Sequence, residues 1–559
     1  MRKSKTNSVK LGLIAIVVFG LIFAVVSATR DWGKSQDAIS AETSLKKLNQ
    51  LYGRLRVDTL NPRKDEAFIY DEAVTVLPDL SEYPFVVNPA TAHFLTVYAC
   101  TEKAGADSWM ADAAERFNQS GAEIDGNPVS VGIRAVPSGL GADFIAADKY
   151  KPDVYAPSTQ LWGDMLISKG VNAHLIAERV AGNVAGVALY NKKYDEMTAK
   201  HGSLSAKTII DSILSGEVQI GYTNPLSSSE GLNFVLTALF TFDERNPLGD
   251  GSISQLRTFQ DNIRYVSYNV SQLRNSAQGG ALDGFVTDYQ LYTTSPELVS
   301  AYKFIPFGVR HDHPLYAIGE LSPVKKQIAE AFAAFCLTED SQKAAKDRGF
   351  YGLDDYVLTQ TKPDGTTILQ AQEAWKKEKN GSSDLTAVFV ADVSGSMEGS
   401  PLLKLKASLN RAATFIDMNT NVGLVTFSDT VSVALPIAKF DQDQKSYFSN
   451  AVKSMRAGGG TAMFDAIVVA QKMLMDAQAR NPNTKLMLFV LTDGETNRGY
   501  EFREVEDLIR ALRIPIYTIG YEADIEILES VSAINEAITM NADTDDVIYK
   551  LQSLFNAQM

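Results

Sequence analysis

Two apolar runs that stop at acidic residues dominate the carboxy-terminal third of the chain. Residues 385–391 are almost entirely apolar, and residues 485–491 form a second run of strand length. Continuous apolar runs of this kind, rich in β-branched and aromatic side chains, are typical of parallel strands buried on both faces. The first run ends at Asp392, and the second is followed shortly by Asp493. The pattern predicts an α/β unit at residues 385–559, with polar loops at the carboxyl ends of its strands.

Strand and helix patterns also alternate through the middle of the chain. The apolar run at residues 94–100 is followed by apolar positions at helical spacing, and the alternation continues to about Trp375. Such alternation predicts another α/β unit, which we place at residues 93–375. Residues 376–384 are charged and then rich in Gly and Ser, the composition of a short flexible linker.

The amino terminus combines a basic flank with an uncharged apolar stretch. Residues 1–10 contain four basic and no acidic side chains, and residues 11–28 are uncharged and apolar. This pattern predicts a cytoplasmic tail and a transmembrane helix that anchors the chain in the cell membrane, with the bulk of it extracytoplasmic. The alternative is a cleaved signal peptide and a secreted protein, because residues 26–28 resemble a cleavage site ending at Ala28. The apolar stretch is longer than a typical signal core, which favours the anchor.

Residues 29–92 are expected to form a stalk or lead-in. Within them, Leu45, Leu48, Tyr52 and Leu55 recur at helical spacing, which predicts an amphipathic stalk or packing helix. Charges and four prolines between residues 56 and 92 indicate irregular structure before the α/β unit that follows.

Length, charge and cysteine content narrow the function classes. A chain of 559 residues exceeds what one hydrophobic core usually supports, so two or three domains are expected. The net charge of -14 argues against a nucleic acid partner, because no basic stripe would neutralise phosphates. Two cysteines, Cys100 and Cys336, are too few for a zinc site or a disulfide-dense scaffold, although they allow one disulfide.

Oxygen-bearing side chains gather in the loops after the two carboxy-terminal strands. Asp392, Ser394 and Ser396 occupy every second position of one loop, Thr461 follows a run of three glycines, and Asp493 follows the second strand. Ligands bind at the carboxyl ends of strands in sheets of this class, so three separate segments could present oxygens at one place. Oxygen donors alone suit a hard divalent cation, and they accept Mg2+, Mn2+ or Ca2+.

This combination resembles the von Willebrand factor A domain and its metal-ion-dependent adhesion site. The resemblance covers residues 384–559 and implies that Ser394 and Ser396 ligate the metal directly and Thr461 directly or through water. It implies that Asp392 and Asp493 act mainly through water. In that family an acidic side chain of a protein partner fills the open coordination position. The implied function is therefore metal-bridged protein binding, with no bond made or broken.

Several segments of residues 93–375 resemble bacterial extracellular solute-binding proteins of the two-lobed type. The similarity lies in the sequences PSGLGAD from Pro137, KPDVYAPST from Lys151, GYTNPLSSSEGL from Gly221 and HPLYAI from His313. The resemblance implies a cleft between two lobes that recognises a small solute or anion. The chain lacks the Ser-Gly-Thr anion loop of the phosphate binders, so the resemblance does not identify a specific ligand.

The best candidate for such a cleft is the segment from Asn224 to Gly231, just before a helix expected to start near Leu232. A helix amino terminus favours anions, although plain capping by Ser228 or Ser229 explains the same residues. The tentative ligand-binding residues are Ser138, Gly139, Ser158, Asn224, Ser228, Ser229 and Asp288. The His311-Asp312-His313 sequence offers too few metal ligands, and a solvated loop is expected there.

Enzyme motifs are missing from the sequence. It contains no Gly-x-Ser-x-Gly elbow, no Walker A loop and no His-Glu-x-x-His, so we expect a binding protein and no catalytic residues. The sequence predicts a membrane-anchored extracytoplasmic protein in which a solute-binding-like module is coupled to a metal-dependent protein-binding domain. Two alternatives remain: a solute-capture component of an ABC-type transporter, and an adhesion or scaffold protein whose solute-binding fold no longer binds a ligand.

Overall fold

A computed structural model describes most of the chain after residue 40. The described residues are 41–65, 77–100, 108–263, 265–267, 270–278, 282–381, 384–494, 496–521, 525–534 and 539–541. Within these ranges no helix is both long and apolar enough to cross a membrane. The predicted cytoplasmic tail and anchor, residues 1–28, lie outside them.

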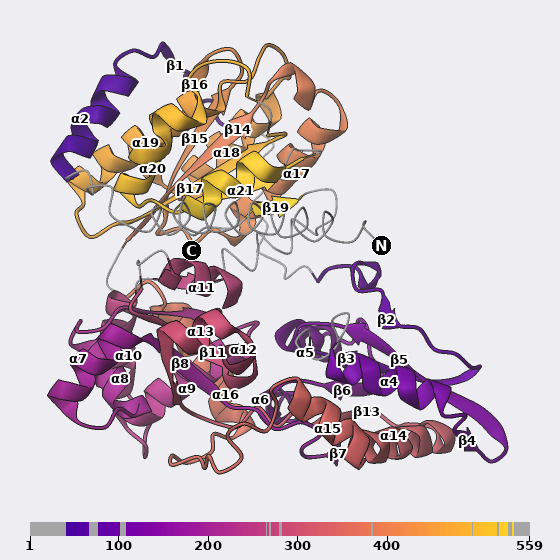
Figure 1. The fold of residues 1–559 in the computed structure, drawn as a ribbon. Coiled ribbons are helices and arrows are strands. Elements are labelled where there is room, and N and C mark those ends of the chain that lie inside the picture. The colour runs from indigo at the N-terminus through magenta and orange to yellow at the C-terminus, as the bar shows by residue number, and fades with distance from the viewer. Residues whose placement is uncertain are drawn as a thin grey trace, which may run out of the picture.

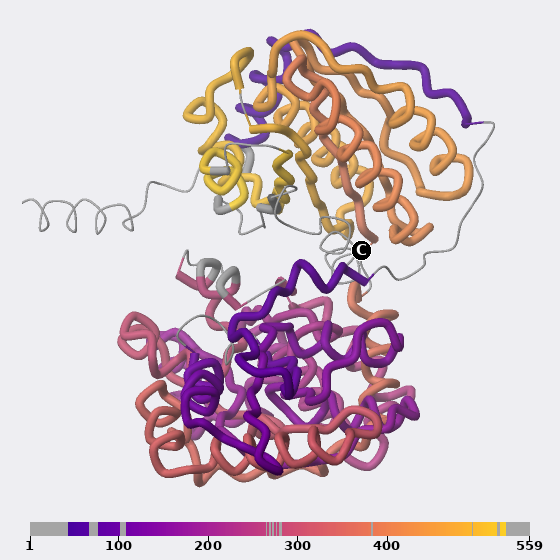
Figure 2. Tube along the Cα trace, turned by 90° about the vertical axis from the view of Figure 1, so that its right-hand side faces the viewer, coloured from indigo at the N-terminus to yellow at the C-terminus, as the bar shows by residue number. Residues whose placement is uncertain are grey.

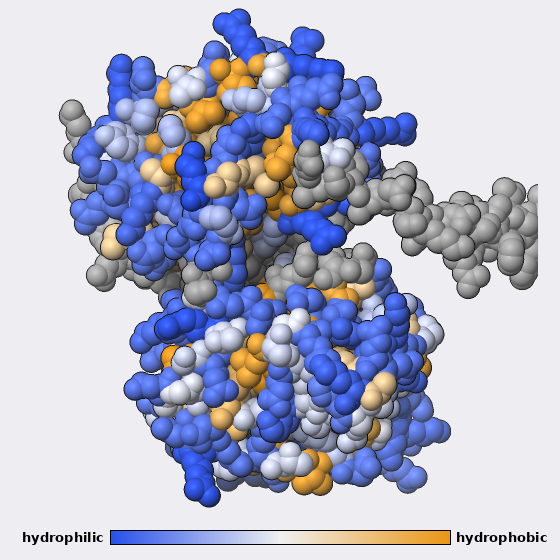
Figure 3. All heavy atoms as spheres, turned by 90° about the vertical axis from the view of Figure 1, so that its left-hand side faces the viewer, coloured by the Kyte–Doolittle hydropathy of each residue, from blue (hydrophilic) through white to orange (hydrophobic). Residues whose placement is uncertain are grey.

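Three sheets organise the described residues, two in a two-lobed unit and one in a carboxy-terminal unit (Figure 1). The two units lie one above the other in Figures 1 and 2. Polar side chains predominate over both units on the face drawn in Figure 3, as expected for an acidic chain in water.

The sheet of the carboxy-terminal unit is built around β14 (Leu385–Asp392), in which all eight residues are buried. This strand pairs in parallel with β15 (Asn421–Phe427) on one side and β17 (Lys485–Thr492) on the other. The apolar runs identified in the sequence therefore form adjacent strands. The remaining strands are β1 (Val57–Thr59), β16 (Val431–Lys439), β18 (Ile516–Gly520) and β19 (Thr539–Asn541), and the order is β1-β16-β15-β14-β17-β18-β19.

Helices cover both faces of this sheet because side chains alternate along β14. Leu385, Ala387 and Phe389 belong to one apolar core, whereas Val388 and Val390 belong to the core on the other face. The first core includes α17 (Ser400–Phe415) and α18 (Gln442–Ser454), and the second includes α19 (Met463–Arg480), α20 (Phe502–Leu512) and α21 (Ile525–Ile534).

The segment before the two-lobed unit belongs structurally to the carboxy-terminal unit. Strand β1 extends the sheet by pairing in parallel with β16, and helix α2 (Ala41–Tyr52) packs on α19 and α20. Leu48 of α2 is fully buried in the apolar core on that face. The indigo trace of this segment lies against the orange and yellow unit in Figure 2. Of the two alternatives for this helix, a stalk or a packing helix, the structure shows a packing helix, and the two-lobed unit is inserted between two parts of one sheet.

The two-lobed unit contains one sheet in each lobe, as the resemblance implied. The first lobe has the strand order β2-β5-β3-β6-β13-β7, namely β2 (Phe85–Val87), β5 (Asn127–Ala135), β3 (His93–Ala99), β6 (Val154–Ala156), β13 (Leu315–Ile318) and β7 (Ala173–Ala177), with β4 (Glu123–Ile124) beside β5. The second lobe has the order β10-β9-β11-β8-β12, namely β10 (Tyr265–Ser267), β9 (Ile220–Thr223), β11 (Gly284–Asp288), β8 (Ala185–Tyr190) and β12 (Tyr302–Pro306).

Helices surround both sheets, and one of them, the last, packs on both lobes. The first lobe carries the short helix η1 (Leu80–Glu82), α4 (Trp109–Gln119), α5 (Ser138–Ala146), α6 (Gln160–Ser168), α14 (Pro323–Cys336) and α15 (Glu339–Asp347). The second carries α7 (Asn191–His201), α8 (Ala206–Leu214), α9 (Ser229–Phe242), α10 (Asp250–Asn262), α11 (Val270–Gln278), α12 (Tyr289–Thr294) and α13 (Pro296–Ala301). Helix α16 (Gly365–Glu378) packs on α6 of the first lobe and on α9 and α10 of the second.

One apolar core runs across the boundary between the lobes. It includes Leu161 and Met165 of α6 together with Phe234 of α9, and all three are buried. Trp375 of α16 is fully buried in the same core and donates its indole N–H to the hydroxyl of Tyr222, 2.6 Å away. The lobes are thus packed against each other directly. Cys100 and Cys336 are both buried and do not form a disulfide with each other.

Candidate functional site

The loop after β14 arranges the first three predicted metal ligands. The backbone N–H of Ser394 donates to Asp392 Oδ1 at 2.8 Å, and Thr492 Oγ1 donates to Asp392 Oδ2 at 2.5 Å. The hydroxyl oxygens of Ser394 and Ser396 lie 3.1 Å apart. Asp392 and Ser394 are fully buried, whereas Ser396 is exposed. The loop therefore offers oxygens that run from the interior to the surface.

The glycine-rich loop and the end of β17 bring in the other two predicted ligands. The N–H of Gly395 donates to the carbonyl of Gly459 at 2.9 Å, so the loop that carries Thr461 lies against the loop of the two serines. Thr461 itself is buried, and Asp493 follows β17, the neighbour of β14. The structure thus places Asp392, Ser394, Ser396 and Asp493 at the carboxyl ends of the adjacent strands β14 and β17, and the loop between α18 and α19 brings Thr461 to the same edge of the sheet.

The electrostatics of this site favour a cation. The pKa of Asp392 is raised to about 6, mainly by burial and to a smaller extent by the charge of Asp493, against hydrogen bonds from Ser394 and Thr492 that lower it. Asp493 Oδ1 is buried and has no hydrogen-bond partner among the residues that the structure describes. A buried carboxylate oxygen without a partner is costly, and a bound cation removes that cost.

The donor set distinguishes between classes of metal. In the described part of the chain, no group of three His, Cys, Asp or Glu side chains is placed to hold a metal ion. The residues gathered here are instead two carboxylates and three hydroxyls. Hydroxyl and carboxylate oxygens fit Mg2+, Mn2+ or Ca2+, whereas zinc sites use nitrogen and sulfur donors.

Two residues that were not predicted from the sequence hold the backbone of the glycine-rich loop at this site. Asn497 Oδ1 accepts the N–H of Thr461 at 2.9 Å, and Asp429 Oδ1 accepts the N–H of Gly460 at 2.9 Å. These side chains hold backbone groups, so they need no motif and left no signal in the sequence. Thr492 was visible beside Asp493, but its hydrogen bond to Asp392 depends on the pairing of β14 with β17.

The predicted solute residues also converge, at the boundary between the lobes. Ser158 of the first lobe donates its hydroxyl to Ser229 Oγ of the second at 2.5 Å, and Trp162 Nε1 donates to the same oxygen at 2.8 Å. The hydroxyls of Ser138 and Ser158 lie 3.4 Å apart. Ser138, Ser158 and Ser229 are all buried. Three of the predicted residues therefore form a chain of hydrogen bonds, in which the bond between Ser158 and Ser229 crosses from one lobe to the other.

The backbone at Gly139 shows how closely the lobes approach. Its N–H donates to the carbonyl of Ser227 at 3.2 Å, and a Cβ added at Gly139 would lie 2.5 Å from Ser227 Cα. Only glycine fits such a contact between two backbones.

The remaining predicted solute residues have structural partners in the second lobe. Ser228 caps α9, which starts at Ser229, three residues earlier than expected, and its hydroxyl donates to Glu230 at 2.6 Å. Asn224 is buried and its Oδ1 accepts the N–H of Leu226 at 2.9 Å. Asp288 caps α12 by accepting the N–H of Leu291 at 2.8 Å. Capping, which the sequence allowed as an explanation of Ser228, is what the structure shows there.

Two buried acids lie close together in this region. Burial raises the pKa of Glu230, and burial followed by the charge of Glu230 raises the pKa of Asp288. His311 acts in the opposite direction on Asp288. His311 and His313 are each only 1% exposed, so the prediction of a solvated loop at these histidines is wrong. The ring of His313 is held by the carbonyl of Ala181 at 2.9 Å, which explains its burial.

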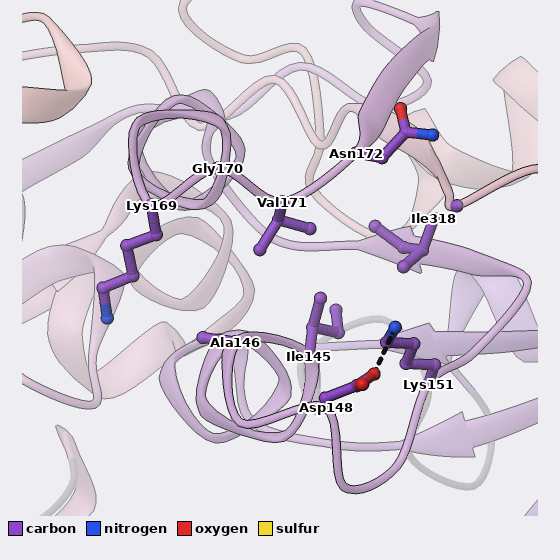
Figure 4. Close-up of a pocket in the computed structure, with 10 residues that line it drawn as sticks. Ile145, Ala146, Asp148, Lys151, Lys169, Gly170, Val171, Asn172 and Ile318 are labelled. Atoms are coloured by element: carbon purple, nitrogen blue, oxygen red, sulfur yellow. Dashed lines mark ion pairs between the residues drawn. The ribbon is translucent and has the colours of Figure 1, made fainter.

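A small pocket of about 260 Å³ lies elsewhere on the first lobe (Figure 4). It is lined by residues that include Ile145, Lys169 and Ile318, and by an ion pair between Asp148 and Lys151. None of the predicted solute residues line it. The boundary between the lobes is therefore the candidate solute site, and this pocket is not.

Comparison with protein families finds both units. The model of the bacterial extracellular solute-binding protein family matches residues 95–351, and that of the von Willebrand factor type A domain matches residues 387–556. Among curated proteins, a von Willebrand factor A domain-containing protein of Dictyostelium discoideum is 29% identical over 176 residues, which cover 30% of this chain and 18% of that protein. Inter-alpha-trypsin inhibitor heavy chain H1 of Mesocricetus auratus is 28% identical over 181 residues, or 30% of this chain and 20% of that protein. The matches therefore span a fifth or less of these relatives.

Solved structures similar to each unit are also found. The sulfate-binding protein SubI from Mycobacterium tuberculosis H37Rv is 16% identical, covering 47% of this chain and 88% of that one, with a TM-score of 0.34. A von Willebrand factor type A structure from Catenulispora acidiphila is 17% identical, covering 31% of this chain and 42% of that one, with a TM-score of 0.28.

Proposed function

Because the chain joins a bacterial extracellular solute-binding domain to a von Willebrand factor type A (VWA) domain, we propose that it binds a protein partner through a divalent cation held by the VWA domain. Both families are binding families, so the proposal involves no catalytic step. The observation that carries it is the buried Asp493 Oδ1 without a hydrogen-bond partner among the described residues, in a cluster with Asp392 and the three hydroxyls.

Each residue of the cluster has a distinct role in this proposal. Ser394, Ser396 and Thr461 supply neutral oxygens, and Asp392 and Asp493 supply the negative charge. A bound Mg2+, Mn2+ or Ca2+ would provide the positive charge that holds an acidic side chain of the partner. Exposed Ser396 marks the side from which the partner approaches.

Calorimetric titration of the metal-stripped full chain with Mg2+ tests the metal site. We expect saturable binding that Ser394→Ala weakens strongly, because that hydroxyl is buried inside the cluster. Capture of envelope proteins by the immobilised chain should require Mg2+ and be lost both in EDTA and with Ser394→Ala. Saturable Mg2+ binding that Ser394→Ala leaves unchanged would contradict the proposed site.

A second candidate function is solute capture between the lobes, either for signalling or for delivery to an ABC-type permease. The convergence of Ser138, Ser158 and Ser229 favours a role for this boundary. Since these hydroxyls bind one another, a solute could enter only if the lobes part. Native mass spectrometry of the full chain and a thermal-shift screen of anions and common solutes test this. A retained molecule or a stabilising compound class would support capture. The absence of both would support a structural role for the two lobes.

We propose that the chain is held at the cell membrane by residues 11–28, with both units outside the cytoplasm. The four basic residues before this stretch support a cytoplasmic amino terminus, and the length of the stretch supports an anchor over a signal peptide cleaved near Ala28. Membrane fractionation with amino-terminal sequencing of the recovered protein distinguishes them. A soluble extracellular product beginning near Thr29 would refute the anchor.

A further inference from the structure

A short loop after the predicted ligand Asp493 holds the backbone of another predicted ligand, Thr461. Asn497 Oδ1 accepts the N–H of Thr461 at 2.9 Å. The N–H groups of Asn497 and Arg498 both donate to the carbonyl of Thr461, at 3.1 and 3.2 Å. We call residues 497–500 the clamp loop, because it fixes both backbone polar groups of Thr461.

The far end of the clamp loop is attached to two helices. The N–H of Tyr500 donates to Asp465 Oδ1 at 2.7 Å, in the first turn of α19. A Cβ added at Gly499 would lie 2.4 Å from the carboxylate of Asp465, so the loop packs directly on this helix. The hydroxyl of Tyr500 donates to the carbonyl of Leu51 at 2.9 Å, in the last turn of α2. The clamp loop therefore connects the amino-terminal segment to Thr461.

Helix α2 is fixed in place by its own contacts with the VWA domain. Leu48 is fully buried and Leu51 is 8% exposed in the core that α19 forms with the sheet. The ammonium group of Lys472 on α19 lies 5.8 Å from the ring centroid of Tyr52. Strand β1, which follows α2, adds a parallel strand to the edge of the sheet. A displacement of α2 would break the Tyr500 hydrogen bond and leave the clamp loop with fewer contacts.

We propose that α2, Tyr500 and Asn497 form a positioning relay, through which the amino-terminal segment sets the placement of Thr461 and hence the affinity of the VWA site for a divalent cation. This inference rests on the proposed metal site. Side chains that hold the ligands of a metal commonly change metal affinity by about 10- to 100-fold when removed. The structure assigns this role to Asn497, and to Tyr500 and α2 through Asn497.

The relay would connect the segment proposed to anchor the chain, which precedes α2, to the proposed metal site. The chain leaves the VWA domain for the two-lobed unit after Asp65, which accepts a hydrogen bond of 2.8 Å from the hydroxyl of Ser449. Helix α2, which precedes this exit, is the helix that contacts Tyr500. Forces that reach the VWA domain through its amino-terminal segment would therefore act first on α2. Coupling of this kind requires a shared set of contacts, and double-mutant cycles measure it.

The test uses the full chain, stripped of metal and titrated with Mg2+ by calorimetry. Asn497→Ala is expected to weaken Mg2+ binding about tenfold. Tyr500→Phe and Leu48→Ala should each weaken it about three- to fivefold, and the double variant should be no weaker than the stronger single variant. Tyr447→Phe on α18, on the opposite face of the sheet, and Leu45→Ala, 39% exposed on α2 itself, are the matched controls and should change the affinity less than twofold.

A second measurement, in EDTA, separates positioning from metal chemistry. Hydrogen exchange of the segment around Thr461 should accelerate in Asn497→Ala, Tyr500→Phe and Leu48→Ala, and should stay slow in both controls. Asn497→Asp keeps an acceptor oxygen for the Thr461 N–H and should restore slow exchange. If Leu48→Ala fails to fold, Tyr500→Phe decides the result, because it removes only one hydroxyl.

The outcomes distinguish this inference from the proposed function. Mg2+ binding by the native chain that Tyr500→Phe and Leu48→Ala leave unchanged would overturn the relay and leave the metal site standing. No Mg2+, Mn2+ or Ca2+ binding by the native chain would overturn both. Weakened binding with accelerated exchange in the relay variants alone would support the relay.

Discussion

Removing the charge of Asp392 should have opposite effects on stability with and without metal. Each pKa unit corresponds to about 1.4 kcal/mol, so the rise of the Asp392 pKa from 3.8 to about 6 corresponds to about 3 kcal/mol. A carboxyl whose pKa is raised by folding contributes stability below pH 3.8 that is lost as the pH rises through about 6. At pH 7.5 in EDTA, Asp392→Asn should therefore be more stable than the native chain, by up to about 3 kcal/mol.

Saturating Mg2+ should reverse this order. A cation present at about 1,000 times its dissociation constant stabilises the native domain by about 4.1 kcal/mol, which exceeds the about 3 kcal/mol that the variant gains in EDTA, and the variant should lose most of the stabilisation by the cation. The single asparagine oxygen can still accept the N–H of Ser394, and its amide NH2 can donate to Thr492 Oγ1 in place of the carboxylate oxygen that accepts from it, so the variant keeps a partner at each position. The comparison therefore isolates charge from shape.

The assay can assign the effect to the VWA domain. Three of the four tryptophans, Trp109, Trp162 and Trp375, lie in the two-lobed unit, and Trp32 lies outside the described residues. Scanning calorimetry detects both units, whereas tryptophan fluorescence follows mainly the two lobes. We expect Asp392→Asn to shift a calorimetric transition that fluorescence does not report. Equal or lower stability of Asp392→Asn in EDTA at pH 7.5, or an equal gain at pH 3.5, would refute the argument from burial.

Three further predictions follow from the packing of the two units. Leu48→Ala should destabilise the VWA domain by about 2 to 4 kcal/mol, because it opens a cavity under α2. Leu45→Ala, at an exposed position of the same helix, should destabilise it by less than about 0.5 kcal/mol. Calorimetry compares the two variants, and equal losses of stability would contradict the packing of α2. Gly139→Ala should loosen the contact between the lobes and accelerate hydrogen exchange at Ser229. The control Gly251→Ala, with no atom within 4 Å of the added Cβ, should leave this exchange unchanged. Slow exchange at Ser229 that survives Gly139→Ala would refute the prediction. Glu230→Gln should stabilise the two-lobed unit at pH 8 but not near pH 4, because its pKa is raised mainly by burial and the stability tied to its proton is lost as the pH rises. Urea denaturation followed by tryptophan fluorescence at both pH values measures this, and a gain at pH 4 as large as at pH 8 would show that charge burial is not the cause.

The sequence alone predicted the oxygen donors of the candidate metal site and determined the class of both folds. Apolar runs that end at Asp392 and just before Asp493 predict buried parallel strands, and such strands place their carboxyl ends at one edge of the sheet. The alternation of patterns likewise predicted two α/β units, because strand and helix periods are local properties of the chain. The match of both segments to their families agrees with this.

Only the tertiary structure decided which contacts those elements make. Leu48 and Leu55 have the spacing of any amphipathic helix, and the sequence does not say that α2 covers a domain whose other strands begin more than 300 residues later. Ser158 and Ser229 were visible as candidates, yet their hydrogen bond to each other depends on how two lobes meet. Asn497 holds a backbone group, and a backbone group has no sequence signature. Local patterns fix the elements, whereas contacts between distant segments depend on packing that no local pattern records.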